Sequence, residues 1–136
     1  MTGKRRQGVL YEDAMQEHLS AEYGEWYIPS PWFIFWSADS MRPRYCQPDG
    51  LLFDPLEKAI WIVEAKLKHT TDAWWQLRHL YTPVIAAVFP PSVWKIRVCE
   101  VVRWYDPAVS FPEKVALVPQ IVGIQGPDFG VHIWVP

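Results

Sequence analysis

The feature that most constrains the fold is a run of nine residues, Ala59 to Leu67, whose first five side chains are all apolar. A strand that is apolar on both faces has to be covered on both faces, so this run predicts a central strand of a sheet. Asp49 to Asp54, just upstream, also has strand character, and a connection of four residues is common in hairpins. We therefore expect a hairpin whose second strand lies inside a sheet.

Helical spacing is found on both sides of this hairpin. From residue 8 to 23, five apolar side chains fall on one helical face, namely Leu10, Tyr11, Ala14, Met15 and Leu19. Thr70 or Thr71 can cap a second helix over residues 73–81, which Pro83 kinks or ends. These two segments predict helices that pack on the sheet.

Further strands are expected elsewhere. The aromatic run within residues 29–36 predicts a buried strand and residues 37–47 a polar loop. Residues 94–104 predict another strand, and shorter β-like runs are expected at 115–118, 121–124 and 131–135. This order of elements predicts one domain over residues 1–136, of the mixed α/β (α+β) class, with helices on a central mixed sheet.

Composition narrows the class of protein. The chain is 50% hydrophobic and only 21% charged, which excludes general disorder, and 13 Pro residues argue against a long coiled coil. The net charge of −2 gives no overall sign of a nucleic-acid partner, although a local basic face can sit on such a protein. The sequence contains no CxxC and no HxxxH spacing, so we do not expect a structural zinc site. We expect no secretory signal, no membrane span and a cytoplasmic location in a bacterial or phage-infected cell.

Charged side chains converge on one end of the hairpin. Pro48-Asp49-Gly50 opens the first strand and Glu64-Ala65-Lys66 closes the second. In the simplest register Asp54 faces Ala59, which places Asp49 directly opposite Glu64, with Cβ atoms roughly 4.5–5.5 Å apart. Because side chains alternate along a strand, Lys66 shares the face of Glu64. Two carboxylates and one ammonium group should therefore meet on a small patch.

Two opposed carboxylates in an apolar sheet repel each other and destabilise the fold. A divalent cation between them removes the conflict, and oxygen ligands favour Mg²⁺ or Mn²⁺ over zinc. The simpler alternative is an ordinary Glu–Lys pair at a surface hairpin end. The position of the triplet, at the end of the most hydrophobic strand, favours a functional site.

With these residues in this order, the chain resembles the PD-(D/E)XK nuclease superfamily over roughly residues 4 to 104. The resemblance is carried by Pro48-Asp49 and Glu64-Ala65-Lys66, by Gly8 and Glu12 in the preceding helix, and by Gln76 and Tyr81 in the following one. It implies a restriction-endonuclease-like central mixed β-sheet flanked by helices. RecB-like members often show Gln-x-x-x-Tyr, whereas Tyr81 lies one position further along.

The resemblance implies a role for each matching residue. Metal ligands for Mg²⁺ or Mn²⁺ would be Asp49, Glu64, the backbone carbonyl of Ala65, and Glu12 from the first helix. Lys66 would position or activate the attacking water and stabilise the charge of the transition state. Gln76 resembles the glutamine of RecB-like members. Such a site suits phosphodiester hydrolysis, because metal ions supply the nucleophile and shield the anionic transition state.

Other charged residues have competing interpretations. Glu17 borders the apolar stripe of the first helix on the edge opposite Glu12, while Asp13 points outward; we favour Glu12 as the helix carboxylate. A basic rim for phosphate contacts is expected from Lys4, Arg5, Arg6, Lys68 and Arg78, although each alone is also explained as a solvated surface charge.

The sequence thus predicts a metal-dependent DNA nuclease acting in recombination, repair or phage DNA processing. A RecB-like exonuclease and a Holliday junction resolvase or other structure-selective endonuclease stay open as alternatives. The expected partner is DNA, either single-stranded, as a duplex end, or branched. A homodimer stays open too, since the apolar stretch from Val115 can form an interface. A non-catalytic DNA-binding or assembly module on the same fold and a Trp-rich interaction module are the non-enzymatic alternatives.

Overall fold

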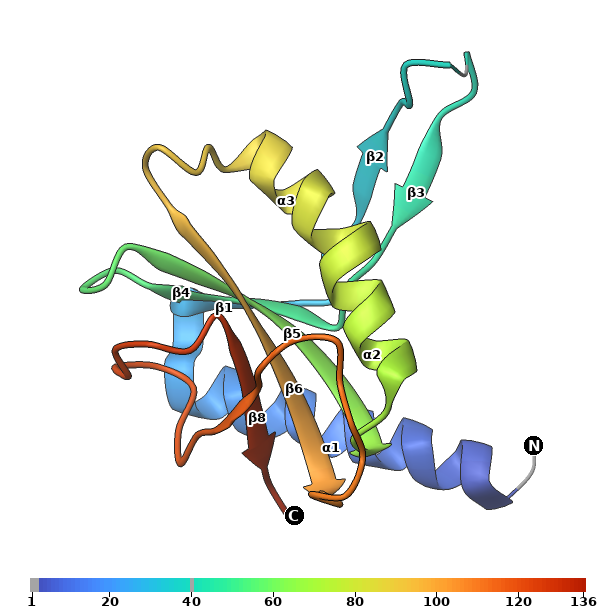
Figure 1. The fold of residues 1–136 in the computed structure, drawn as a ribbon, viewed down its shortest axis with the longest axis vertical. Coiled ribbons are helices and arrows are strands. Elements are labelled where there is room, and N and C mark those ends of the chain that lie inside the picture. Colours follow the sequence, from blue (N-terminus) through green and yellow to red (C-terminus); the bar gives the residue numbers. More distant parts are fainter. Residues whose placement is uncertain (1–2, 40) are drawn as a thin grey trace.

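The computed structural model describes residues 3–39 and 41–136, and these residues form a mixed α/β fold with a six-stranded mixed sheet and a separate two-stranded sheet (Figure 1). The helical elements in chain order are α1 (Gly3–Tyr23), the 3-10 turn η1 (Gly24–Trp26), α2 (Thr71–Trp75), the π-helical η2 (Gln76–Tyr81) and α3 (Thr82–Val88). The strands are β1 (Tyr27–Pro29), β2 (Phe33–Phe35), β3 (Arg44–Cys46), β4 (Gly50–Asp54), β5 (Ala59–Lys68), β6 (Lys95–Trp104), β7 (Ala116–Leu117) and β8 (Phe129–Ile133).

The main sheet has the strand order β1-β4-β5-β6-β8-β7. β1, β4 and β5 pair antiparallel, while β5, β6, β8 and β7 pair parallel. The predicted hairpin register is confirmed, with Asp54 opposite Ala59 and Gly50 opposite Val63. β5 is an inner strand, as its apolar run predicts, and it runs next to β6 on its other side.

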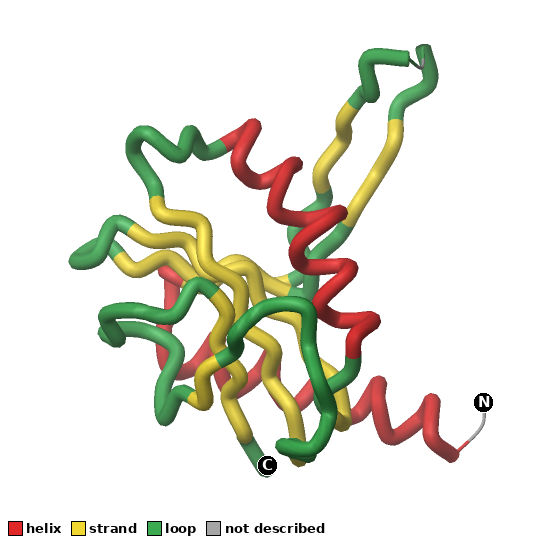
Figure 2. The backbone as a smooth tube through the Cα atoms, in the orientation of Figure 1, coloured by secondary structure: helices red, strands yellow, loops and turns green. Residues whose placement is uncertain are grey.

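Two apolar layers cover the sheet, one on each face. Figure 2 shows the helical segments that lie against the strands. α1 packs on one face through Tyr11, Met15 and Leu19, which are buried at a spacing of four residues. The helical stretch α2–η2–α3 packs on the other face through Leu77, Tyr81 and Ile85. The alternation of side chains along β5 therefore sends Ile62 to one layer and Val63 to the other.

α1 begins earlier than predicted, at Gly3, and its first turns extend past the edge of the sheet (Figure 1). Leu10, predicted on the buried face, is exposed instead. At about 100° per residue, Leu10 lies roughly 140° around the helix from the centre of the buried Tyr11–Met15–Leu19 stripe, so it points away from the sheet although Tyr11 is buried. The N-terminal half of α1 also lines the cleft described below.

The strand predicted within residues 29–36 is present as β2, but its predicted burial is wrong, and the predicted loop over 37–47 contains a further strand, β3. β2 and β3 pair with each other as a two-stranded arm that projects from the body of the protein (Figure 1). Phe33 and Phe35 pack against the core on one side of this arm, while Trp32, Ile34 and Trp36 remain exposed. A two-stranded ribbon with one face on the core can bury only every second residue of a continuous aromatic run.

The second predicted helix is confirmed, but it is longer and locally widened. Thr70 occupies the N-cap position without a side-chain capping bond, and the helix continues beyond Pro83 to Val88. Residues 76–81 follow the wider i→i+5 hydrogen-bonding pattern. Pro83 has no N–H to donate and its ring crowds the preceding turn, which accounts for a widened segment just before it. Thr82 Oγ1 donates to the carbonyl of Leu77 at 2.6 Å.

The C-terminal segment contributes short strands to the main sheet. Two of its three predicted β-like runs form short strands, β7 and β8, whereas residues 121–124 form none. Of the apolar residues from Val115 onward, Val118, Ile121 and Val131 are buried within this chain, whereas Leu117, Ile133 and Val135 are exposed. Among the described residues, the helices are all too short or too polar to cross a membrane.

Candidate active site

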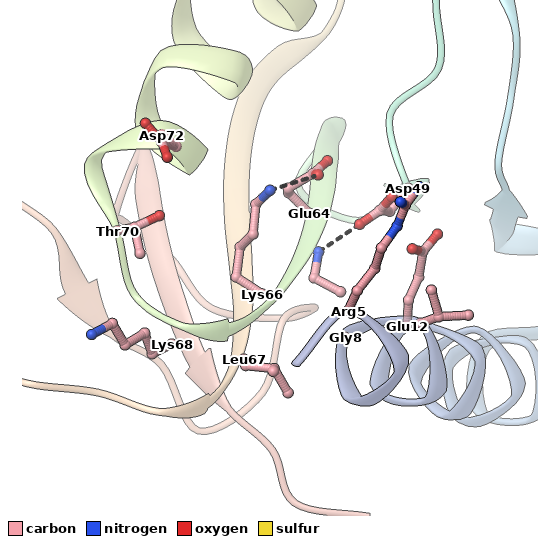
Figure 3. Close-up of a pocket in the computed structure, with 12 residues that line it drawn as sticks. Arg5, Gly8, Glu12, Asp49, Glu64, Lys66, Leu67, Lys68, Thr70 and Asp72 are labelled. Atoms are coloured by element: carbon pink, nitrogen blue, oxygen red, sulfur yellow. Dashed lines mark hydrogen bonds and ion pairs between the residues drawn. The ribbon is translucent and has the colours of Figure 1, made fainter. Parts of the chain in front are cut away.

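A cleft of about 490 Å³ opens where β5 leaves the cover of both helical layers (Figure 3). β5 is buried from Ala59 to Glu64, half-buried from Ala65 to Leu67 and exposed at Lys68. The cleft is lined by Arg5, Gly8, Val9 and Glu12 of α1, by Asp49, by residues 64–68 of β5, and by Thr70 and Asp72 before and within α2. It therefore collects Glu12, Asp49, Glu64 and Lys66, four of the five predicted catalytic residues.

Asp49 immediately precedes β4 and is fixed by several hydrogen bonds. Its Oδ2 accepts the backbone N–H of Ala65 at 2.7 Å, which ties it to β5 beside Glu64. Its carbonyl accepts Gln16 Nε2 at 2.6 Å and the N–H of Ser30 at 2.8 Å. Gln16 is held in turn by the hydroxyl of Tyr27. The position of this carboxylate is thus determined by α1, β1 and β5 together.

Gly50 allows β1 and β4 to pack closely together next to Asp49. A Cβ atom added to Gly50 would lie 2.2 Å from Tyr27 Oη and 2.5 Å from two ring carbons. The Tyr27 ring therefore occupies the space that any other side chain at position 50 would need. The glycine of the Pro48-Asp49-Gly50 sequence serves to pack β1 against β4 behind Asp49.

The Asp49 and Glu64 carboxyls carry strongly perturbed pKa values. Burial raises the pKa of Asp49 to about 7; the Ala65 N–H opposes this and the neighbouring Glu12 carboxyl adds to it. Burial raises the pKa of Glu64 to about 8, with a further contribution from Asp49 and an opposing one from Lys66. The site therefore holds more acidic groups than it can ionise without a cation.

Lys66 neutralises only part of this excess. Its Nζ forms an ion pair with Glu64 Oε1 at 3.8 Å, and the other carboxylate oxygen, Oε2, is buried with no hydrogen-bond partner among the described residues. Figure 3 shows Lys66 directed toward Glu64 within the cleft. An unpaired buried carboxylate oxygen has a large desolvation cost. Oε2 of Glu64 thus remains available for a further positively charged group.

The donor set fits a divalent cation held by oxygen. Asp49, Glu64 and the Ala65 carbonyl would be its ligands, with Glu12 near enough to Asp49 to share a hydrogen bond. As the side chains stand, the described residues contain no group of three or more His, Cys, Asp or Glu arranged to hold a metal ion. The fit therefore rests on two carboxylates with raised pKa values and one unpaired buried oxygen.

The structure places the two competing helix carboxylates in different surroundings. Glu12 lines the cleft, whereas Glu17 is exposed and is not among the lining residues. Asp13 is exposed as predicted. The way α1 crosses β5 thus turns the edge that carries Glu12 toward the cleft and leaves the edge that carries Glu17 outside it.

The predicted basic rim is only partly assembled. Arg5 extends from α1 toward Asp49, and Lys68 also lines the cleft (Figure 3). Lys4 lies beside Lys68 in an adjoining hollow. Arg6 is exposed and lines neither hollow.

Arg78 was placed incorrectly in the basic rim. Its guanidinium pairs with both carboxylate oxygens of Glu113, with N···O distances of 2.7–3.1 Å. A bidentate pair of this kind occupies the donors that a phosphate would need. Glu113 comes from a distant part of the chain, so nothing near Arg78 in the sequence indicated the pairing.

Gln76 lies at the start of η2 and is not among the residues that line the cleft, although its Oε1 is buried and unpaired within the described part of the chain. The i→i+5 pattern of η2 brings residues five apart onto one side of the helix. Tyr81 therefore lies on the side of Gln76 despite its extra position in the sequence. The Tyr81 hydroxyl donates to the carbonyl of Gln47 at 3.4 Å, two residues before Asp49, although Tyr81 does not line the cleft. Burial raises the pKa of Tyr81, and the Glu64 and Asp49 carboxyls add to the effect.

One buried pair was missed by the sequence analysis. Glu100 of β6 lies next to Glu64 in the parallel register, is fully buried, and hydrogen-bonds His69 through the ring Nδ1. Burial raises the pKa of Glu100 and lowers that of His69, because it disfavours the charged form of each. The signal was present, because Ile96, Val98 and Glu100 share one strand face that has to be buried.

Comparison with known proteins finds no family model, no curated protein and no solved structure that matches this chain.

Proposed function

We propose that this chain is a metal-dependent deoxyribonuclease with a restriction-endonuclease-like fold, of the PD-(D/E)XK kind. The single observation that carries the proposal is the pair Asp49–Glu64, two buried carboxyls with pKa values raised to about 7 and 8 beside the unpaired oxygen of Glu64. Structural sites rarely keep like charges buried without compensation, whereas catalytic metal sites require them.

Each residue has a part in phosphodiester hydrolysis. Asp49, Glu64 and the Ala65 carbonyl would hold Mg²⁺ or Mn²⁺, and Glu12 would complete the site from α1. When bound, the metal ion supplies an activated water and shields phosphate charge. Lys66, on the face of Glu64, orients that water and stabilises the negative charge that develops on the phosphorus oxygens. Arg5, Lys68 and Lys4 border the cleft and would hold the DNA backbone.

The test is a cleavage assay with defined DNA substrates. Purified protein is incubated with single-stranded, duplex, flapped and four-way DNA, with Mg²⁺, with Mn²⁺ or with chelator. We expect cleavage that requires the metal and is lost in Asp49→Asn and Glu64→Gln, while Glu17→Gln, outside the cleft, retains it. The preferred substrate separates an exonuclease from a structure-selective endonuclease. Absence of cleavage on all substrates with both metals, or equal cleavage by Glu64→Gln, would reject the proposal in favour of a non-catalytic module.

A further inference from the structure

The β2–β3 arm carries an aromatic surface on its outer side. Side chains alternate along β2, so Phe33 and Phe35 face the core while Trp32, Ile34 and Trp36 face solvent. Tyr45 of β3 lies opposite Ile34 and is exposed too. Trp32, Trp36 and Tyr45 are 66%, 62% and 60% exposed. We call these four side chains, Trp32, Ile34, Trp36 and Tyr45, the outer face of the arm.

Exposing an apolar face of this size to water is energetically unfavourable while the protein has no partner bound. Single exposed apolar residues are common, but three large aromatic rings on one face of one ribbon indicate an interaction site. The inner face of the same ribbon already supplies the contacts that anchor the arm to the core. The outer face is therefore not needed to stabilise the fold.

The arm is joined to the candidate active site through its base. The chain leaves β3 at Cys46 and reaches Asp49 three residues later. Gln47 Nε2 donates to the carbonyl of Ser30 at 2.9 Å, and the N–H of Ser30 donates to the carbonyl of Asp49 at 2.8 Å. Ser30, before the arm, is thus hydrogen-bonded both to Gln47, after the arm, and to Asp49. These bonds anchor both ends of the arm beside Asp49.

The charge of the arm favours a polyanion over a second copy of this chain. Residues 30–48 contain two arginines, Arg42 and Arg44, and one acidic residue, Asp39, within a protein of net charge −2. Two copies meeting through their arms would bring like charges together. Arg44 lies opposite Phe35 and so shares the inner face of the arm, which leaves the outer face itself uncharged. Exposed flat aromatic rings bind single-stranded nucleic acid, because every unpaired base offers a face for stacking. Bases within a duplex are already stacked and cannot pair with the rings in this way.

We propose that the outer face of the β2–β3 arm stacks on unpaired bases of single-stranded DNA and holds that strand at the mouth of the cleft. This proposal rests on the proposed nuclease function for its substrate, but the stacking itself can be measured without cleavage. It predicts a preference for DNA with an unpaired segment, as at an end, a flap or a branch.

The test measures binding in chelator, where no metal-dependent cleavage occurs. Fluorescence anisotropy compares a labelled thymidine oligonucleotide with a duplex of the same length, and tryptophan quenching is followed in parallel. The double variant Trp32→Ala/Trp36→Ala should bind the single strand at least about tenfold more weakly, since each stacked base contributes on the order of 1–3 kcal/mol. Duplex binding should change by less than about twofold, and Trp26→Ala, an exposed tryptophan of η1, is the matched control.

A variant of the metal site separates this proposal from the previous one. Asp49→Asn should lose cleavage but bind the single strand as tightly as the wild type, whereas the arm variant should lose single-strand affinity while its metal-dependent stabilisation is retained. The stacking proposal is overturned if the double variant binds the single strand like the wild type, or if Trp26→Ala weakens binding equally. It is overturned as well if sedimentation shows that the double variant dissociates a dimer without a change in DNA affinity.

Discussion

Without a divalent metal ion, the protein should lose stability as the pH rises from about 5 to about 8. The pKa values of Asp49 and Glu64 are raised by folding to about 7 and about 8. Across this window the folded state therefore binds more protons than the unfolded state, and the free energy of unfolding falls as the pH rises. Replacing Asp49 with Asn should make this dependence shallower by the part that Asp49 contributes, whereas Glu64 and Glu100 keep theirs because burial is the main cause of their raised pKa values.

The size of the effect follows from the perturbation of Asp49. One pKa unit corresponds to about 1.4 kcal/mol. Raising the Asp49 pKa from 3.8 to about 7 therefore destabilises the metal-free fold by about 4 kcal/mol once the carboxyl is ionised. Asn keeps an oxygen for the Ala65 N–H but adds a buried amide group without a partner, which costs about 1–3 kcal/mol. We expect Asp49→Asn to raise the free energy of unfolding at pH 8 by about 2 kcal/mol.

Urea denaturation at pH 5, 6.5 and 8 measures this directly, with and without Mn²⁺. Asp13→Asn, an exposed aspartate on α1, is the matched control and should leave the pH dependence unchanged. Mn²⁺ should stabilise the wild type more at pH 8 than at pH 5, because the ion binds the ionised carboxylates, and should have no such effect on Asp49→Asn. A wild-type protein whose metal-free stability is flat or rises between pH 5 and 8 would refute the reasoning.

Three further results follow from the structure. Gly50→Ala should lower the free energy of unfolding by about 2–3 kcal/mol in urea denaturation, because its Cβ meets the Tyr27 ring; Gly8→Ala, with open space around it, should not, and equal losses would contradict the packing argument. Glu12→Gln should weaken Mn²⁺ binding in a calorimetric titration whereas Glu17→Gln should not, and the reverse order would transfer the role to Glu17. Lys68→Ala should weaken DNA binding and reduce its salt dependence, while Arg78→Ala, already paired with Glu113, should change affinity by less than about twofold.

Local patterns were enough to predict the hairpin and the residues at its end. The register of β4 and β5 follows from a four-residue loop, and the burial of β5 follows from its continuous apolar run. Helical periodicity placed Glu12 at the edge of the buried stripe of α1, and the structure puts that edge at the cleft. Such features depend on neighbours along the chain and on regular geometry, so the sequence carries them directly.

The features that the sequence analysis missed depend on partners far away in the chain. The aromatic run at β2 was predicted to be buried because its composition suits a core strand, but only one side of the arm meets the core. Arg78 finds Glu113, and Glu100 finds His69, across long separations. The widened segment η2 was not predicted for another reason. A proline near a helix end predicts a kink, but it does not specify the hydrogen-bonding pattern of the turn before it.

The central claim is that Lys66 acts on the reaction and does not merely accompany Glu64. The most direct measurement is single-turnover cleavage of DNA by Lys66→Met, made beside a calorimetric Mn²⁺ titration of the same variant. We predict metal binding and folding like those of the wild type, with a cleavage rate lower by two or more orders of magnitude, roughly 2.7 kcal/mol or more of lost transition-state stabilisation. DNA affinity should change far less, because the interaction develops in the transition state. Cleavage at close to the wild-type rate by a folded, metal-binding Lys66→Met protein would contradict the claim.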